Sequence, residues 1–190
     1  MTTPGTYRES DETEVSAADA SAAWVVEARP ALERVAAKYQ ATITYKELAE
    51  AVQSASGIRT RKLVQNWVGA VLSVVARDCH AAGEPLLSAL CVRADGTVGP
   101  GYVASIVELT GDEAPEDPDM HAAHQRLECY RRFGATMPAD GGKATLTPKI
   151  TAARARARKL ATVALKEESR PICPTCFLML PVTGQCDNCA

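Results

Sequence analysis

The stretch Cys173-Pro174-Thr175-Cys176, followed after nine residues by Cys186-Asp187-Asn188-Cys189, decides the fold of the last part of the chain. In each CxxC pair, a tight turn brings two sulfurs to the same side of the backbone. Four thiolates can then surround a single ion, and Zn²⁺ prefers such a tetrahedral set of sulfur ligands. We therefore predict a short zinc ribbon over residues 171–190, with four ligands: Cys173, Cys176, Cys186 and Cys189.

Two other interpretations of these cysteines stay open, namely a pair of disulfides and a redox-active CxxC pair. The sequence shows no secretory features, which favours the metal site. Zinc knuckles often have Gly after the second Cys, whereas this chain has Phe177 and Ala190. The segment contains few apolar residues, so bound metal would supply most of its folding free energy. A site closed by four thiolates has no open position for a substrate, and this favours a binding role over catalysis.

Composition points to a globular protein without a membrane span. The chain has 190 residues, of which 46% are hydrophobic and only 5% aromatic, an Ala/Val/Leu-rich mixture typical of a high-GC bacterium or phage. No segment approaches the roughly 18 apolar residues that a membrane helix needs, and we expect a cytoplasmic protein. The cysteines outside the ribbon lie in apolar patterns and are expected to be reduced core residues: Cys79, Cys91 and Cys129.

Charge is divided unevenly along the chain, although the net charge is only −2. Residues 1–142 carry 13 basic and 20 acidic side chains, a net charge of −7. Residues 143–170 carry eight basic and two acidic side chains, a net charge of +6. A basic segment joined to an acidic body indicates an anionic partner such as nucleic acid. The alternative is that the basic segment docks onto the acidic body itself.

The sequence pattern predicts a mostly helical α+β protein. Helical periodicity dominates up to Gly83, and a long apolar helix is expected from about Thr60 to Ala82. Leu86–Arg93 has the pattern of a strand, Asp95-Gly96 is a hairpin signal, and residues 97–108 are expected to form the return strand. The expected organisation is a disordered acidic tail over 1–15, a helical, winged-helix-like body over 16–136, a linker over 137–147, a basic helix over 148–170 and the ribbon over 171–190.

The order of two helices, a long third helix and a β-hairpin is that of a winged helix-turn-helix, in which the third helix enters the DNA groove. Four polar residues near the start of the third helix are the DNA-binding candidates of the body: Arg59, Arg61, Lys62 and Asn66. A helix N-terminus with basic side chains favours phosphate binding. The alternative is an ordinary solvated helix end.

Three segments of the body resemble the DNA-binding domain of alkylguanine-DNA alkyltransferases and alkyltransferase-like proteins. They are residues 44–49 (TYKELA), 66–72 (NWVGAVL) and 88–102 (SALCVRADGTVGPGY), within about sixty residues of the chain. The resemblance implies a winged helix that binds the DNA minor groove and flips a base. In that alignment Ser88 replaces the reactive Cys, and Asn66 replaces the intercalating Arg. The resemblance therefore implies, at most, a catalytically inactive binder of modified DNA.

The basic helix is the stronger DNA-binding candidate, because its cations flank an apolar stripe. These cations, which suit phosphate contacts, are Lys149, Arg154, Arg156, Arg158 and Lys159. The first hypothesis is a non-enzymatic DNA-binding protein that uses the body, the basic helix and the zinc ribbon. The alternative is a protein–protein module whose ribbon docks on a polymerase or replication complex. A third hypothesis is an enzyme acting on DNA, with a site around His80, Glu84 and Arg93.

Overall fold

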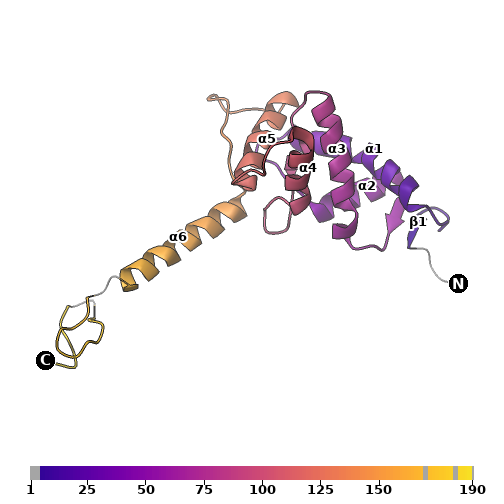
Figure 1. The fold of residues 1–190 in the computed structure, drawn as a ribbon. Coiled ribbons are helices and arrows are strands. Elements are labelled where there is room, and N and C mark those ends of the chain that lie inside the picture. The colour runs from indigo at the N-terminus through magenta and orange to yellow at the C-terminus, as the bar shows by residue number, and fades with distance from the viewer. Residues whose placement is uncertain (1–4, 169–170, 182–183, 190) are drawn as a thin grey trace. The chain divides into compact units, whose positions relative to one another are not determined.

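The protein is described by a computed structural model that covers residues 5–168, 171–181 and 184–189. It is a mostly helical α+β chain with two compact units, Met1–Pro148 and Lys149–Ala190 (Figure 1). The predicted body and the predicted linker both belong to the first unit. The α-helices of that unit are α1 (Ala17–Ala36), α2 (Tyr45–Ser56), α3 (Val68–Ala81), α4 (Pro100–Thr110) and α5 (Pro118–Arg132).

The segment expected to be a disordered tail contains a strand, so that prediction is wrong for the described residues 5–15. Strand β1 (Thr6–Arg8) pairs antiparallel with β3 (Ile58–Thr60). The hydroxyls of Thr6 and Thr60 lie 3.0 Å apart, and Arg61 donates its backbone N–H to Gly5. Partners more than 50 residues away along the chain thus supply the order that local composition does not. Residues 1–4 lie outside the described part.

The core of the first unit forms where α1, α2 and α3 meet. Trp24 of α1 and Trp67, just before α3, stack with ring centroids 4.1 Å apart, and the Trp24 indole donates to the Ile58 carbonyl at 3.0 Å. Leu32, Leu48 and Val71 are almost completely buried around them. The regular spacing of apolar residues on these helices explains the packing, because each helix turns one stripe inward.

The beginning of α2 is fixed by a capping box. Thr44 accepts the backbone N–H of Glu47, and the Glu47 carboxylate accepts the backbone N–H of Thr44 at 2.7 Å. Just before the helix, β2 (Ile43–Thr44) pairs in parallel with β4 (Cys91–Val92). This pairing places the start of α2 beside the turn that follows Val92.

The structure contradicts the predicted wing. The expected first strand is largely the 3₁₀ helix η2 (Leu87–Leu90) followed by the two-residue β4, although the Asp95-Gly96 turn does form. The expected return strand over 97–108 is instead mostly helix α4, which packs beside α3 (Figure 1). Pro100 at the first helical position and Gly111 in the left-handed conformation define its ends, while Tyr102 and Ile106, one turn apart, are buried.

The expected long third helix is also interrupted. Its first part consists of β3 and the 3₁₀ helix η1 (Val64–Asn66), and α3 begins only at Val68. Thr60 donates its backbone N–H to the Gln53 side chain at 2.8 Å, which holds this segment in strand geometry. Consequently, Arg59, Arg61 and Lys62 do not lie on a helix.

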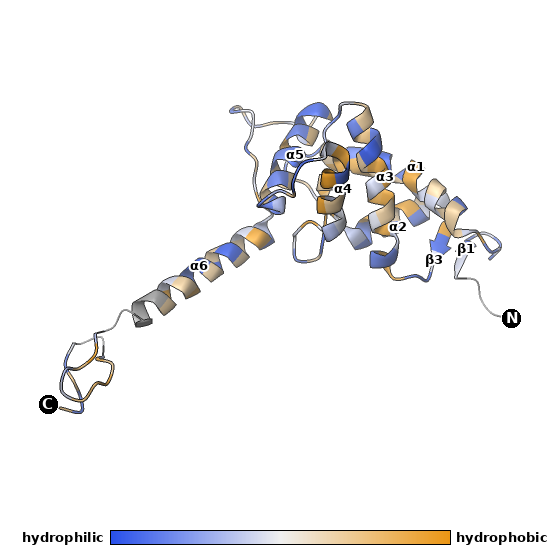
Figure 2. Cartoon of the chain, in the orientation of Figure 1, coloured by the Kyte–Doolittle hydropathy of each residue, from blue (hydrophilic) through white to orange (hydrophobic). Residues whose placement is uncertain are grey.

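Helix α5 is largely hydrophilic (Figure 2), yet it buries an arginine. Arg126 is only 3% exposed and donates to the carbonyls of Ala89 and Thr145, both at 3.2 Å. Tyr130 of the same helix donates to the Ala41 carbonyl at 2.7 Å. These hydrogen bonds connect η2, α5 and the segment before α6 within the first unit.

Glu84 is expected to stabilise the first unit in a pH-dependent manner. Its carboxylate accepts from Arg29 of α1 and from Arg132 of α5 at 3.1 Å, and the Arg29 hydrogen bond holds the pKa of Glu84 below its usual value of 4.5. A lowered folded-state pKa contributes stability above the unfolded-state pKa, and this contribution is lost as the pH falls through the folded value. Glu84→Gln should therefore lower the free energy of unfolding by about 1–2 kcal/mol at neutral pH.

Urea unfolding of wild type and Glu84→Gln at neutral and acidic pH measures this difference. The two curves should converge once the carboxylate is protonated. Glu128→Gln is the control, because the one ion pair of Glu128 among the described residues is with exposed Arg131 at 2.8 Å, and the substitution should change stability by less than about 0.5 kcal/mol. A Glu84→Gln effect that persists unchanged in acid contradicts the assignment.

The second unit consists of α6 (Pro148–Glu168, of which Pro148 belongs to the first unit) and the cysteine-containing segment. Residues 169–170 of the predicted basic helix and residues 182–183 and 190 of the predicted ribbon lie outside the described part. Within the described residues, every helix falls short of the length and hydropathy that crossing a membrane requires.

Candidate metal centre

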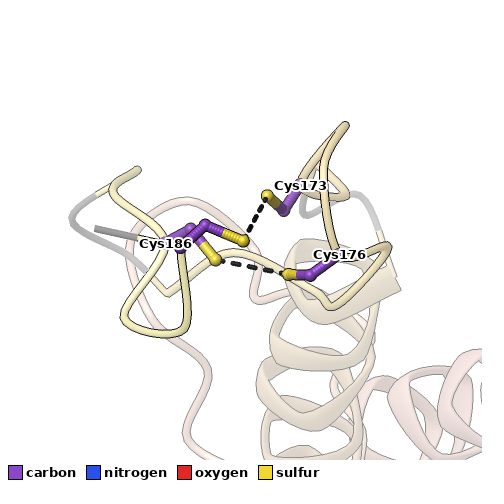
Figure 3. Close-up of side chains that lie close together, drawn as sticks. Cys173, Cys176 and Cys186 are labelled. Carbon is purple, nitrogen blue, oxygen red and sulfur yellow. Dashed lines mark hydrogen bonds between the residues drawn. The ribbon is translucent and has the colours of Figure 1, made fainter.

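The four predicted ligands converge on one point in the second unit. The sulfurs of Cys173, Cys176, Cys186 and Cys189 all lie within 4.8 Å of one another. The Cys176 and Cys186 sulfurs are 3.4 Å apart, and those of Cys173 and Cys189 are 3.9 Å apart (Figure 3). Zn–S bonds of about 2.3 Å in a tetrahedron require sulfurs about 3.8 Å apart. The cluster therefore has the dimensions of a four-thiolate metal site.

Short-range backbone hydrogen bonds shape the first knuckle. Phe177 donates its N–H to the Cys173 carbonyl at 2.9 Å, which closes the turn, and Cys173 donates its N–H to the Leu178 carbonyl at 2.8 Å. An isolated antiparallel bridge joins Ile172 and Met179. A second turn lies at Cys186–Cys189, where the Cys189 N–H points to the Cys186 carbonyl at 3.4 Å. Two such turns facing each other form the knuckles of a ribbon.

Phe177 occupies the position where zinc knuckles often have glycine, and the structure shows the reason for that preference. Its φ is +59°, in the left-handed region that residues with a Cβ adopt at a cost of about 1–2 kcal/mol. The turn after Cys176 thus retains its geometry without glycine. The Phe177 side chain remains 78% exposed.

The local field favours a thiolate at Cys173. Backbone N–H groups of Cys176 and Thr175 point at its sulfur and lower its pKa to about 6. The pKa of Cys189 is raised to about 12, chiefly by its hydrogen bond with Cys176. Four thiolates so close together repel one another, so complete deprotonation requires a cation in their midst.

The donor set fits a soft or borderline divalent metal and no other obvious cofactor. All seven cysteines are free in the described structure, and Cys79, Cys91 and Cys129 are buried in the first unit as predicted. No other group of three or more His, Cys, Asp or Glu side chains in the described residues is placed to hold a metal. Four thiolates complete a tetrahedron, so the arrangement suits a structural metal.

The DNA-binding candidates of the body lie on β3, on the connection that follows it and on η1. Arg59 is paired with Glu9 at 3.2 Å and with Glu50 at 2.7 Å. Arg61 lies over the Tyr7 ring, with 5.1 Å between its guanidinium carbon and the ring centroid. Lys62 and Asn66 are exposed on the connection before α3. Two glutamates therefore neutralise Arg59, whereas Arg61 and Lys62 are exposed.

The candidates of the second unit lie together on the first part of α6. Arg156, Arg158 and Lys159 are exposed, and Arg154 is half-buried. No acidic residue occurs between Pro148 and Leu165. The helix therefore carries five basic side chains in eleven residues, from Lys149 to Lys159, without a counter-charge on the same stretch.

A group of exposed apolar side chains beside the metal centre was missed by sequence reasoning. Ile172, Leu178 and Met179 are 61%, 55% and 53% exposed, in addition to Phe177. The signal was present in the sequence as four apolar residues within eight positions of a small metal-dependent segment. Such a segment cannot bury them, because its interior is occupied by the metal site.

No family model, curated protein or solved structure matches this chain.

Proposed function

We propose that the protein is a non-enzymatic DNA-binding protein that grips the phosphate backbone with α6 and a zinc-loaded ribbon. The observation that supports it most is the run of five basic side chains on α6 directly before a four-thiolate cluster. Arginine and lysine contacts to phosphates supply most of the affinity of such proteins without reading sequence. The thiolate set and its spacing favour Zn²⁺ as the metal.

The proposed DNA contact surface differs from the one expected from the sequence. The wing is replaced by α4, and Arg59 is neutralised by Glu9 and Glu50. The body would then contribute little cationic surface, and its negative charge would disfavour close approach to DNA. A catalytically inactive binder of modified DNA remains a narrower form of the same proposal.

Fluorescence anisotropy of a labelled random duplex, with zinc-loaded protein, tests the proposal. If about three cations contact phosphates, the affinity should fall about a hundredfold between roughly 50 and 300 mM salt. A steep linear dependence of log affinity on log salt supports phosphate contacts. Absence of binding at the lowest salt rejects the DNA-binding function.

One observation favours a second candidate function, a protein-docking module. The exposed side chains of Ile172, Phe177, Leu178 and Met179 form an apolar group of the kind found at protein interfaces. In this alternative, the ribbon docks on a host machine such as a polymerase or replication complex. Partner capture that is unaffected by nuclease and by salt, and that is lost in Phe177→Ser, distinguishes it from DNA binding.

A further inference from the structure

The first unit contains a large cavity that the DNA-binding proposal does not use. It has a volume of about 830 Å³, within the range of small-molecule sites. Its walls come from the starts of α2 and α4, from η1 and from the turn at Arg93-Ala94. We call it the α2–α4 cavity. All these segments belong to one compact unit, and the parallel pairing of β2 with β4 brings two of them together.

The charged side chains that line the cavity are both positive. Lys46 and Arg93 are exposed, and neither forms an ion pair among the described residues. The nearest acidic side chains along the chain are engaged elsewhere. Glu47 accepts from the Thr44 backbone and hydroxyl, and Asp95 accepts from the Thr97 backbone at 3.0 Å and hydroxyl at 2.6 Å. Both carboxylates keep their negative charge, and Asp95 is close enough to Arg93 for that guanidinium to help lower its pKa, so the cations of the cavity wall are partly balanced by these neighbours.

The N-terminus of α4 also lies at the cavity wall. The helix begins after Gly99 without a side-chain cap, and Pro100 has no N–H to be satisfied. Gly99, Pro100 and Gly101 all line the cavity, so the positive end of the helix dipole lies at its wall. Gly99 must lack a Cβ, because the Tyr45 hydroxyl occupies the place where that atom would be.

A buried hydroxyl lies at a separate, water-sized void that shares lining residues with the cavity. Ser88 is 5% exposed, and its hydroxyl has no hydrogen-bond partner among the described residues. It lines a void of about 10 Å³ that shares Tyr45, Gly69 and Gly101 with the α2–α4 cavity. Burial raises the pKa of Tyr45 to about 12, so its hydroxyl keeps its proton as a neutral hydrogen-bond donor.

The remaining walls are apolar and suit a ligand with a flat or aliphatic body. Val64, Ala94, Pro100 and the Tyr45 ring lie around the cavity. We propose that the α2–α4 cavity binds an organic phosphate, with Lys46, Arg93 and the start of α4 holding the phosphate and these walls holding the organic part. This function is separate from DNA binding through α6, because it uses only residues of the first unit.

Amide NMR of the full zinc-loaded chain, titrated with phenyl phosphate, tests the proposal. Glycine signals provide the readout, because Gly69, Gly99 and Gly101 line the cavity, whereas Gly57 and Gly134 do not. The first three should shift with a millimolar or tighter dissociation constant, and the other two should not. Phenyl phosphate should bind tighter than inorganic phosphate. Equal affinities for phenyl phosphate and inorganic phosphate would contradict a role of the apolar walls in binding.

Charge-removing variants test the role of the cations. Lys46→Ala and Arg93→Ala should each weaken phenyl phosphate about tenfold, because each removes a charge-assisted contact. Lys38→Ala and Arg77→Ala are the matched controls, since both residues are exposed and lie outside the cavity lining. No shift of the three glycine signals, or equal binding by all four variants, overturns the proposal.

Two further experiments identify the source of the phosphate and distinguish binding in the cavity from DNA binding through α6. If a short duplex displaces phenyl phosphate, the natural ligand of the cavity is a phosphate group of DNA. If phenyl phosphate stays bound, the natural ligand is a free organic phosphate. Both results support a phosphate site in the cavity. A chain whose α6 cations Arg156, Arg158 and Lys159 are replaced by Gln should bind phenyl phosphate like wild type. Loss of phenyl phosphate binding in that chain overturns the assignment to the first unit.

Discussion

Cys176→Ala is expected to abolish metal binding and to unfold the ribbon while the first unit stays folded. Among the described residues of the segment after α6, Cys173 alone is buried, and Ile172, Phe177, Leu178 and Met179 are exposed. With no apolar core, the segment depends on its metal, whose binding contributes about 10–16 kcal/mol in comparable zinc modules. Metal analysis should give one zinc per wild-type chain and none for the variant.

Amide NMR should show the unfolding of the ribbon directly. Signals of residues 171–181 should move to random-coil positions in Cys176→Ala or after chelation, and those of α1 to α5 should remain. Cys79→Ala is the control, because Cys79 is completely buried in the first unit. That variant should lower the stability of the first unit and leave the zinc content unchanged. A dispersed ribbon spectrum in metal-free protein contradicts the structural role of the metal.

Replacing Arg156, Arg158 and Lys159 by Gln is expected to weaken duplex binding about a hundredfold at low salt. Each lost phosphate contact removes the release of about one counterion, so the slope of log affinity against log salt should also decrease by up to about three. These three side chains are exposed on α6, so the substitutions should not affect folding. Anisotropy titrations at several salt concentrations measure both quantities.

A matched variant separates this local effect from the change in net charge. Arg34, Lys38 and Arg77 are exposed on or beside α1 and α3, and their replacement by Gln changes the net charge by the same amount. This control should retain nearly all of the affinity. If both triple variants lose affinity equally, the binding reflects the overall charge of the protein, and the assignment to α6 is wrong.

Features determined by neighbouring residues could be predicted from the sequence. The spacing of the four cysteines indicated a single cluster, because each CxxC turn is a local structure. The tetrahedral geometry that a metal prefers then requires the two turns to face each other. The Thr44 and Glu47 capping box is likewise a contact over three residues. The start of α5 is also a local structure, with the Asp117 side chain accepting the Met120 N–H.

Features determined by distant residues were predicted wrongly. The apolar residues of 97–108 fit a strand or a helix, and burial of Tyr102 and Ile106 against the rest of the first unit favours the helix. Strand β1 forms because β3 lies opposite, and Arg59 is neutralised by Glu9 and Glu50. The α2–α4 cavity was also missed, because Lys46 and Arg93 are 47 positions apart and meet only through the pairing of β2 with β4.

The measurement that tests the central proposal most directly is duplex affinity of the same chain with and without zinc at one low salt concentration. If α6 and the ribbon act together on the phosphate backbone, removing the metal should weaken binding by at least tenfold, and adding zinc should restore it. Equal affinity in the two states would contradict a DNA-binding role for the metal centre.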